Sequence, residues 1–265
     1  MNRLIGIFLL CILGSLACSK PENVISDEPV HIHNLNYSFP SPIHHFLLLD
    51  KLMFDWQKID FEPKKSQIHS QEAYALHIGV EASEEIVFIL AGDHARAAQA
   101  RKVILQHATK LEIAHEVEDS FAKFQNLLDQ KASKKVLLEK AGHLEEEIEV
   151  ALVKHGKEPY AVLSDIGSWL EGFHILVKEL SLRYDPKLSL ILHESHIAEL
   201  YHEALVELQK SGKLPKKNKL IQDLDLFLGK VKEITLPKKE KPVSLPVVRK
   251  LLKLTTEIRK EIREL

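Results

Sequence analysis

The sequence predicts an all-α fold, a multi-helix bundle of about eight or nine helices that run mostly antiparallel, up and down. Apolar residues recur every three or four positions through most of the chain after residue 42, which is the period of an amphipathic helix. Short stretches with Gly, Pro or Asp separate these segments, and short connections place consecutive helices side by side in opposite directions. No segment shows a convincing strand pattern, because the β-prone run at residues 85–90 lies inside a long helical pattern.

The helices are expected in the order of their boundary residues. Pro42 opens the first, because a proline at an early helical position loses no hydrogen bond, and the apolar surface of this helix continues to Trp56. Ser66 begins the second helix, which ends at Gly92, and Asp93 caps the third. The third to sixth periodic segments are expected at residues 97–115, 121–128, 133–154 and 158–180. The seventh follows the break at Pro186 and runs to residue 210, and the last two are expected at residues 219–234 and 244–265.

Composition divides the chain into four parts. Residues 1–17 are expected to be a signal peptide, and residues 18–42, which contain four prolines, an extended tether that begins at Cys18. Residues 43–235 form the predicted helical bundle domain. Residues 236–265 are expected to be a Pro- and Lys-rich linker followed by an amphipathic helix, because prolines 237 and 242 interrupt any continuing helix.

The amino-terminal segment indicates export. Arg3 precedes an almost wholly apolar run at residues 4–16, and the small residue Ala17 stands directly before Cys18. The run is too short to cross a bilayer, which needs about 20 apolar residues. Ala17 followed by Cys18 resembles the lipobox of bacterial lipoproteins.

This resemblance implies cleavage before Cys18 and attachment of a lipid to that residue. It also implies a location at the bacterial cell envelope, anchored to a membrane on the periplasmic side. In bacterial lipoproteins Asp after the cysteine is associated with inner-membrane retention, and this chain has Ser19 there. The outer membrane is therefore favoured.

The lipobox match is a relaxed one. The common pattern has Leu three residues before the cysteine and a small residue two before it, whereas this chain has Ser15 and Leu16. Ordinary secretory cleavage nearby is the alternative to lipidation. Cys11 and Cys18 are the two cysteines of the chain, so the exported part has no pair for a disulfide.

The charges are distributed unevenly along the chain. Residues 19–209 carry 19 basic and 31 acidic residues, and residues 210–265 carry 16 basic and 7 acidic ones. Either the two parts neutralise each other when they pack, or the basic C-terminal part contacts an envelope protein or an anionic polymer. No nucleic-acid partner is expected, because the basic stretch at residues 213–219 has no aromatic residues for base stacking.

The last predicted helix is strongly amphipathic. We expect it to dock on the bundle with its charges in water; lying on a membrane surface or pairing with a partner helix is the alternative. No aromatic residue follows Phe227, although interfacial helices commonly use them. The side expected in water carries Arg249, Lys250, Lys253, Arg259, Lys260 and Arg263.

Small residues predict two places of close helix contact. Ala75, Gly79 and Ser83 are spaced four apart and share one helix face, and Gly167 and Gly172 lie within the sixth helix. Glycine inside a helix is unfavourable by about 0.5–1 kcal/mol relative to alanine, which the approach of a neighbouring helix or of a ligand offsets. The segment Gly-Ser-Trp-Leu-Glu-Gly-Phe that holds the last two glycines resembles one in uncharacterised all-helical bacterial proteins, a resemblance that implies no activity.

Fifteen histidines are many for 265 residues, and they raise the question of a metal site. Di-iron bundles take Glu-x-x-His from each of two helices and a further Glu from each of two others. This spacing occurs at Glu112, Glu171 and Glu199, but the Glu171 pair is expected in solvent. His193 and His196 are three apart and add a possible surface chelate. The candidate metal ligands are Glu112, His115, His193, His196, Glu199 and His202.

No enzyme signature accompanies these residues. The chain has no Gly-rich phosphate loop, no Gly-x-Ser-x-Gly and no His-Glu-x-x-His, and the segment His193 to His196 is one residue short of the last. Cys-x-x-Cys-His is missing as well, so covalent haem attachment is not expected. The predicted function is therefore an exported, lipid-anchored helical protein with a binding or scaffolding role, without an enzymatic activity or a cofactor. The alternative is a His/Glu metal- or haem-binding helical bundle.

Overall fold

The computed structural model describes residues 30–32, 37–39, 43–51, 54–59, 61, 68–236 and 241–264. The predicted signal peptide, Cys18 and most of the predicted tether lie outside these residues. The described part contains nine α-helices, which confirms the predicted all-α class. They are α1 (Ile43–Lys51), α2 (Gln71–Leu90), α3 (His94–Lys110), α4 (Ala114–Asp129), α5 (Lys134–Lys154), α6 (Glu158–Leu182), α7 (Ser195–Lys210), α8 (Lys219–Thr235) and α9 (Leu245–Glu264).

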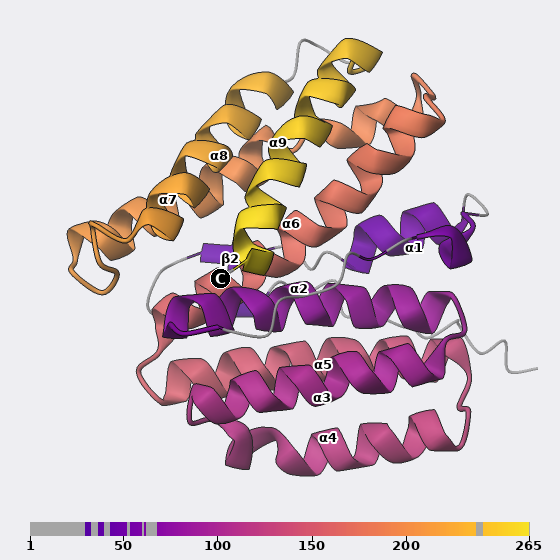
Figure 1. Ribbon diagram of the computed structural model, residues 1–265, viewed down its shortest axis with the longest axis vertical. Helices are drawn as coiled ribbons and strands as arrows, with labels where there is room; N and C mark the ends of the chain where they lie inside the picture. The colour runs from indigo at the N-terminus through magenta and orange to yellow at the C-terminus, as the bar shows by residue number, and fades with distance from the viewer. Residues whose placement is uncertain are drawn as a thin grey trace, which may run out of the picture.

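The helices form two sets that are inclined to each other (Figure 1). In one set α2, α3, α4 and α5 lie nearly along one direction, and in the other α6, α7, α8 and α9 run obliquely across it. The most extensive contact between helices joins α2 to α6, and α6 also packs against α9. Connections of three or four residues separate α2, α3, α4, α5 and α6, so these consecutive helices fold back on one another.

Short irregular elements complete the described chain. Two three-residue strands, β1 (Val30–Ile32) and β2 (Tyr37–Phe39), pair antiparallel, an element that the sequence analysis did not predict. One 3₁₀ turn, Trp56–Lys58, lies beyond the end of α1, so this helix stops earlier than predicted. A second 3₁₀ turn, Leu188–Leu192, precedes α7.

Polar side chains cap the first turns of several helices, where they accept hydrogen bonds from backbone N–H groups that have no partner within the helix. The side chains of Ser70, Asp93 and Ser133 each accept a hydrogen bond from the backbone N–H three residues later, at 3.1, 2.9 and 3.4 Å. Asp93 and Ser133 stand where the sequence predicts a helix start. The second helix begins at Gln71 rather than at Ser66, because Ser70 supplies the cap.

Four helices end in the same hydrogen-bonding pattern. A residue with positive φ follows the helix, and the next N–H bonds back to the carbonyl five residues earlier, as in a Schellman motif. Glycine takes the positive φ at Gly92 and Gly156, which the sequence signals, whereas Glu112 and Lys131 take it after α3 and α4. The predicted third helix therefore ends at Lys110 instead of continuing to His115.

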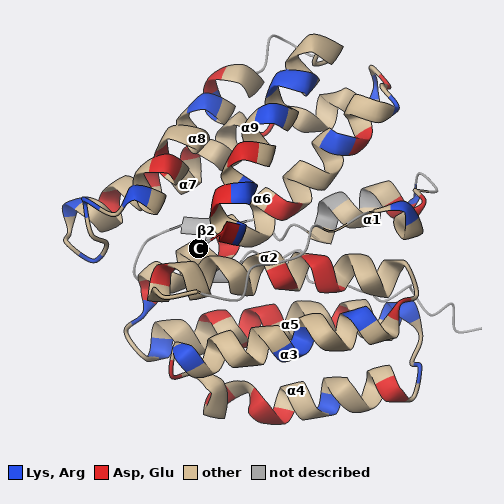
Figure 2. Ribbon diagram, in the orientation of Figure 1, with Lys and Arg blue, Asp and Glu red and all other residues tan. Residues whose placement is uncertain are grey.

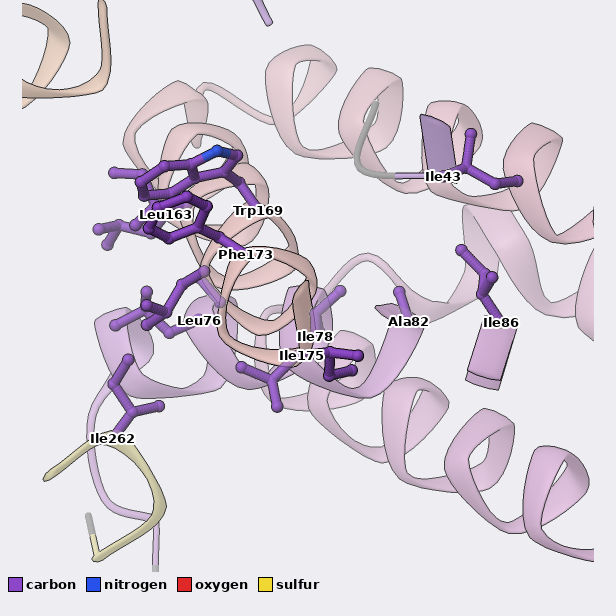
Figure 3. Packing of buried hydrophobic residues seen from close by; sticks show 14 of the residues in the cluster. Ile43, Leu76, Ile78, Ala82, Ile86, Leu163, Trp169, Phe173, Ile175 and Ile262 are labelled. Atoms are coloured by element: carbon purple, nitrogen blue, oxygen red, sulfur yellow. The ribbon is translucent and has the colours of Figure 1, made fainter. Parts of the chain in front are cut away.

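The α2–α6 contact is a close approach of two backbones. A Cβ on Gly79 would lie 1.8 Å from the Ser164 carbonyl oxygen, and a Cβ on Gly167 would lie 2.2 Å from that of Leu76. Helix packing therefore requires both glycines. Of the two reasons expected for glycine inside these helices, a neighbouring helix or a ligand, the structure shows the neighbouring helix. Beside the crossing, Trp169 stacks on Phe173 with ring centroids 5.2 Å apart, and both are fully buried (Figure 3).

The apolar core extends from this crossing through both sets of helices. Buried side chains from all nine described α-helices join one continuous cluster. Within the described residues, no helix combines the length and the apolar character needed to cross a membrane.

We expect Gly79→Ala and Gly167→Ala to lower the free energy of unfolding by at least about 2 kcal/mol, because the added methyl group would displace a neighbouring backbone carbonyl. Chemical denaturation measures the change. Gly142→Ala and Gly229→Ala are matched controls inside helices, where a Cβ meets nothing within 4 Å. They should raise stability by about 0.5–1 kcal/mol. Equal effects of all four substitutions would contradict the close crossing.

Candidate functional site

The structure separates Glu112 from His115, the first predicted Glu-x-x-His pair. Glu112 lies in the turn after α3 with φ 58°, and His115 lies on α4, so the two residues do not share a helix face. The exposed Glu112 carboxylate accepts a hydrogen bond of 2.9 Å from Lys157 Nζ. The Lys157 ammonium holds the pKa of Glu112 below its usual range. Glu112 is therefore one partner of a surface ion pair.

His193 and His196 do not converge either. His193 precedes α7, and its two ring nitrogens lie 3.2 Å from the Thr235 carbonyl oxygen and 2.9 Å from that of Lys241. His196 is exposed at the start of α7. The His193 ring thus joins the end of α8 to the segment before α9.

Glu199 and His202 lie on α7, and each faces a partner on α8. Glu199 pairs with Lys232, and His202 Nδ1 lies 2.8 Å from Asp225 Oδ1. His202 also lines an open hollow of about 390 Å³ along the surface of α7. These contacts hold the α7–α8 hairpin together and do not bring the two residues to a common point.

Buried charges gather instead where α9 packs on α2 and α6. Arg259 donates two hydrogen bonds to the Glu171 carboxylate, at 2.6 and 2.7 Å, and Arg263 pairs with Glu84 of α2. All four side chains are buried. Two guanidinium groups therefore balance two carboxylates inside the protein, which allows charges to be withdrawn from water.

This arrangement corrects two expectations of the sequence analysis. Arg259 and Arg263 were expected on the solvated side of the last helix, and Glu171 and His174 on a solvated face of the sixth. All four residues are buried, because α9 lies across α6 and covers that face. The expectation that the last helix docks on the bundle is confirmed for α9.

The buried pairs set the protonation of their neighbours. Burial opposes ionisation of Glu171, but Arg259 and Arg263 outweigh it and hold the pKa of Glu171 below its usual value. Burial, with the nearby Arg259 charge, lowers the pKa of His174 to about 4. His174 is therefore neutral near pH 7, and its Nδ1 lies 2.9 Å from Thr255 Oγ1 on α9.

A second buried pair joins α2 to α3. Arg101 donates to both carboxylate oxygens of Glu85, and both residues are at most 3% exposed. The Arg101 guanidinium also lies over the ring of Phe124, 4.0 Å from its centroid, and 5.2 Å from that of Phe121. One arginine thus links α2, α3 and α4 by charge and by cation–π contact.

Three carboxyl groups lie close enough to interact along α5 and α6. Burial raises the pKa values of Glu145 and Glu149 to about 7, and nearby carboxylates add to the rise. Burial and these two residues raise the pKa of Asp165 well above its usual value. Ser168 Oγ lies between α5 and α2, 3.4 Å from Glu145 Oε1 and 3.0 Å from Ser83 Oγ. Figure 2 shows the acidic residues along α2 and α5.

Among the described residues, one group of His and acidic side chains converges as metal ligands would. It consists of His115 and Glu116 at the start of α4 and His155 after the end of α5, with one ligand atom from each within 4.8 Å of the others. All three side chains are at the surface. His115 was among the predicted ligands, whereas Glu116 and His155 were missed. The short α4–α5 connection could have revealed them, since it places the start of one helix beside the end of the next.

Comparisons of the chain with protein-family models, with curated proteins and with solved structures gave no match. The chemistry of these groups is therefore inferred from their own geometry.

We expect Arg259→Met to lower the free energy of unfolding by about 3–5 kcal/mol, because it leaves the buried Glu171 carboxylate without its bidentate partner. The double variant with Glu171→Met should recover much of this loss in denaturant titrations. Lys253→Ala is the control on the same helix, where an exposed pair with Glu257 at 3.8 Å should contribute less than about 0.5 kcal/mol. An equally small effect of Arg259→Met would contradict the buried network.

The raised pKa values of Glu145 and Glu149 predict a pH dependence of stability. The folded chain retains protons on these groups between about pH 4.5 and 7 that the unfolded chain releases. Their contribution to stability is full below that range and is lost as the pH rises through about 7. Glu149→Gln should therefore stabilise the protein by about 1–3 kcal/mol at pH 8 and have little effect at pH 4.5. Glu147→Gln, at an exposed position of α5, should change stability at neither pH.

Proposed function

We propose that this protein is exported and acts at a bacterial cell envelope, held to a membrane by a lipid on Cys18. The observation that carries the proposal is the amino-terminal sequence, in which Arg3, an apolar run at residues 4–16 and Ala17 precede Cys18. The periplasmic side, and the outer membrane in particular, belong to the same proposal. The proposal does not require an enzymatic activity of the protein.

The proposed role of the body is binding or scaffolding. Its support is a set of exposed basic side chains that take no part in the buried pairs and gather at the α7–α8 connection and along α9 (Figure 2). These side chains are suited to an envelope protein or an anionic polymer. They are Lys213, Lys216, Lys217, Arg249, Lys250, Lys253 and Lys260.

The buried arginines refine this proposal. The sequence places sixteen basic residues after residue 209, but Arg259 and Arg263 are neutralised inside the protein by Glu171 and Glu84. At the surface, Lys219 pairs with Asp223 and Glu261. Three of the exposed lysines also lie within 4 Å of a carboxylate: Lys213 of Glu158, Lys253 of Glu257 and Lys260 of Glu264. The charge offered to a partner is therefore smaller than the sequence count, and it lies on the α7–α8 connection and on the outer side of α9.

The test is fractionation of cells that produce the chain and its Cys18→Ala variant. We expect the chain to stay in the membrane fraction through a wash in 1 M salt, and Cys18→Ala to leave that fraction. Globomycin, which blocks lipoprotein signal cleavage, should make the chain migrate more slowly in gels and should not affect the variant. Unchanged mobility and unchanged partition in both experiments would remove the anchor.

The same fractions test the basic surface. If this surface binds an anionic envelope component, part of the Cys18→Ala variant should remain in the membrane fraction at low salt. It should be released as the salt concentration rises, because screening weakens exposed charge contacts. Binding that does not respond to salt, or no binding at all, would exclude this role while leaving the lipid anchor intact.

A further inference from the structure

We propose that His115, Glu116 and His155 form a zinc-binding site between the start of α4 and the end of α5. The proposal does not depend on the lipid anchor or on the basic surface. It differs from the metal site expected from Glu-x-x-His spacing. Its ligands come from the start of α4 and the residue that follows α5, and only His115 belongs to both sets.

Two of the three separations between ligand atoms match those around a tetrahedral zinc ion, and all three atoms lie within 4.8 Å of one another. Glu116 Oε1 lies 3.3 Å from His115 Nε2 and 3.2 Å from His155 Nε2. Ligand atoms that bind zinc at 2.0–2.1 Å in tetrahedral geometry are separated by about 3.3–3.4 Å. The two imidazole rings are steeply inclined, at 81°, with centroids 5.4 Å apart. Small side-chain adjustments would therefore bring all three atoms onto one ion.

The backbone around the ligands is already tied together. Lys157 donates to the Leu111 carbonyl at 2.7 Å and to the Glu112 carboxylate at 2.9 Å, which fastens the turn before α4 to the turn after α5. His155 and Glu116 stand at the ends of helices, where the backbone is held by capping hydrogen bonds. Preorganised ligands lose less conformational entropy when the ion binds.

The donor set suits zinc. Two imidazoles and one carboxylate, with water in the fourth position, is a known zinc arrangement, and the exposed site leaves that position open. The Glu116 carboxylate is already held in place, because it accepts two hydrogen bonds from Lys154 Nζ and lies 3.2 Å from His155 Nε2.

Lys154 is the competitor for this position. Its ammonium lies 2.8 and 2.9 Å from the two Glu116 oxygens and must leave one of them when a cation binds. The lysine side chain is 62% exposed, so it can turn into solvent. Lys154→Met should therefore strengthen zinc binding severalfold, an effect that a chance association of zinc with scattered histidines would not show.

The experiment titrates the purified full chain, stripped with EDTA, with zinc chloride by calorimetry at pH 7.5. We expect one site that is weakened about tenfold or more by His155→Ala and by Glu116→Gln. His143→Ala is the matched control, since His143 faces Glu146 at 3.4 Å on the surface of α5 without a second histidine. It should leave binding unchanged, and circular dichroism checks that every variant is folded.

Absorption of the cobalt-substituted chain gives a second readout, because a four-coordinate ion produces visible bands that His155→Ala should abolish. Three results would overturn the proposal: no zinc binding by the chain, full binding by His155→Ala, or equal losses from His143→Ala and His155→Ala. Weaker binding by Lys154→Met would also count against the site, because it would mean that the ammonium does not compete with the ion.

Discussion

The structure depends on the contact between α2 and α6, which can form only because Gly79 and Gly167 have no side chains. At this crossing each glycine lies against a backbone carbonyl of the opposite helix, so the two helices approach as closely as their main chains permit. Every other helix packs, directly or through a neighbour, on one of these two. The crossing also explains why polar residues are buried nearby. The central turns of both helices are buried, so their charged residues Glu84, Glu85 and Glu171 are withdrawn from water and must find partners inside.

Arginine residues on the helices that cover α2 and α6 are the partners of these buried carboxylates. Arg101 comes from α3, and Arg259 and Arg263 come from α9. A buried pair of this kind is weak support for stability by itself, because the desolvation of two ions offsets much of their attraction. We expect its main effect to be on the register of α9, because a shift of α9 along α6 would leave a buried carboxylate unpaired. The carboxyl groups of α5 and α6 lie close to one another, and burial raises their pKa values, which connects the stability of the body to pH.

The helical period predicted the class of fold, the order of the helices and most of their boundaries. Its largest errors include the starts of α2 and α4 and the end of α3. The turn at Glu112, which ends α3 without glycine, separates the predicted pair of ligands from each other. The helical period also assigned Arg259, Arg263, Glu171 and His174 to water, because periodicity within a single helix does not show which neighbour covers its polar face. The trio at His115 was missed for the related reason that its members are close only across a helix hairpin. Spacing within one helix predicts local neighbours, whereas these sites depend on the packing of different helices.

The pairing of Arg263 with Glu84 has a consequence for the order of events during synthesis. The two residues are 179 positions apart, so α2 and α6 emerge from the ribosome long before the arginines that neutralise them. Until then we expect their interior-facing carboxylates to favour contact with water over burial, which opposes complete packing around the central crossing. We therefore expect the chain to complete its folding only after α9 has been made. That property suits a protein proposed to pass through a membrane as an extended polypeptide and to assemble on the other side.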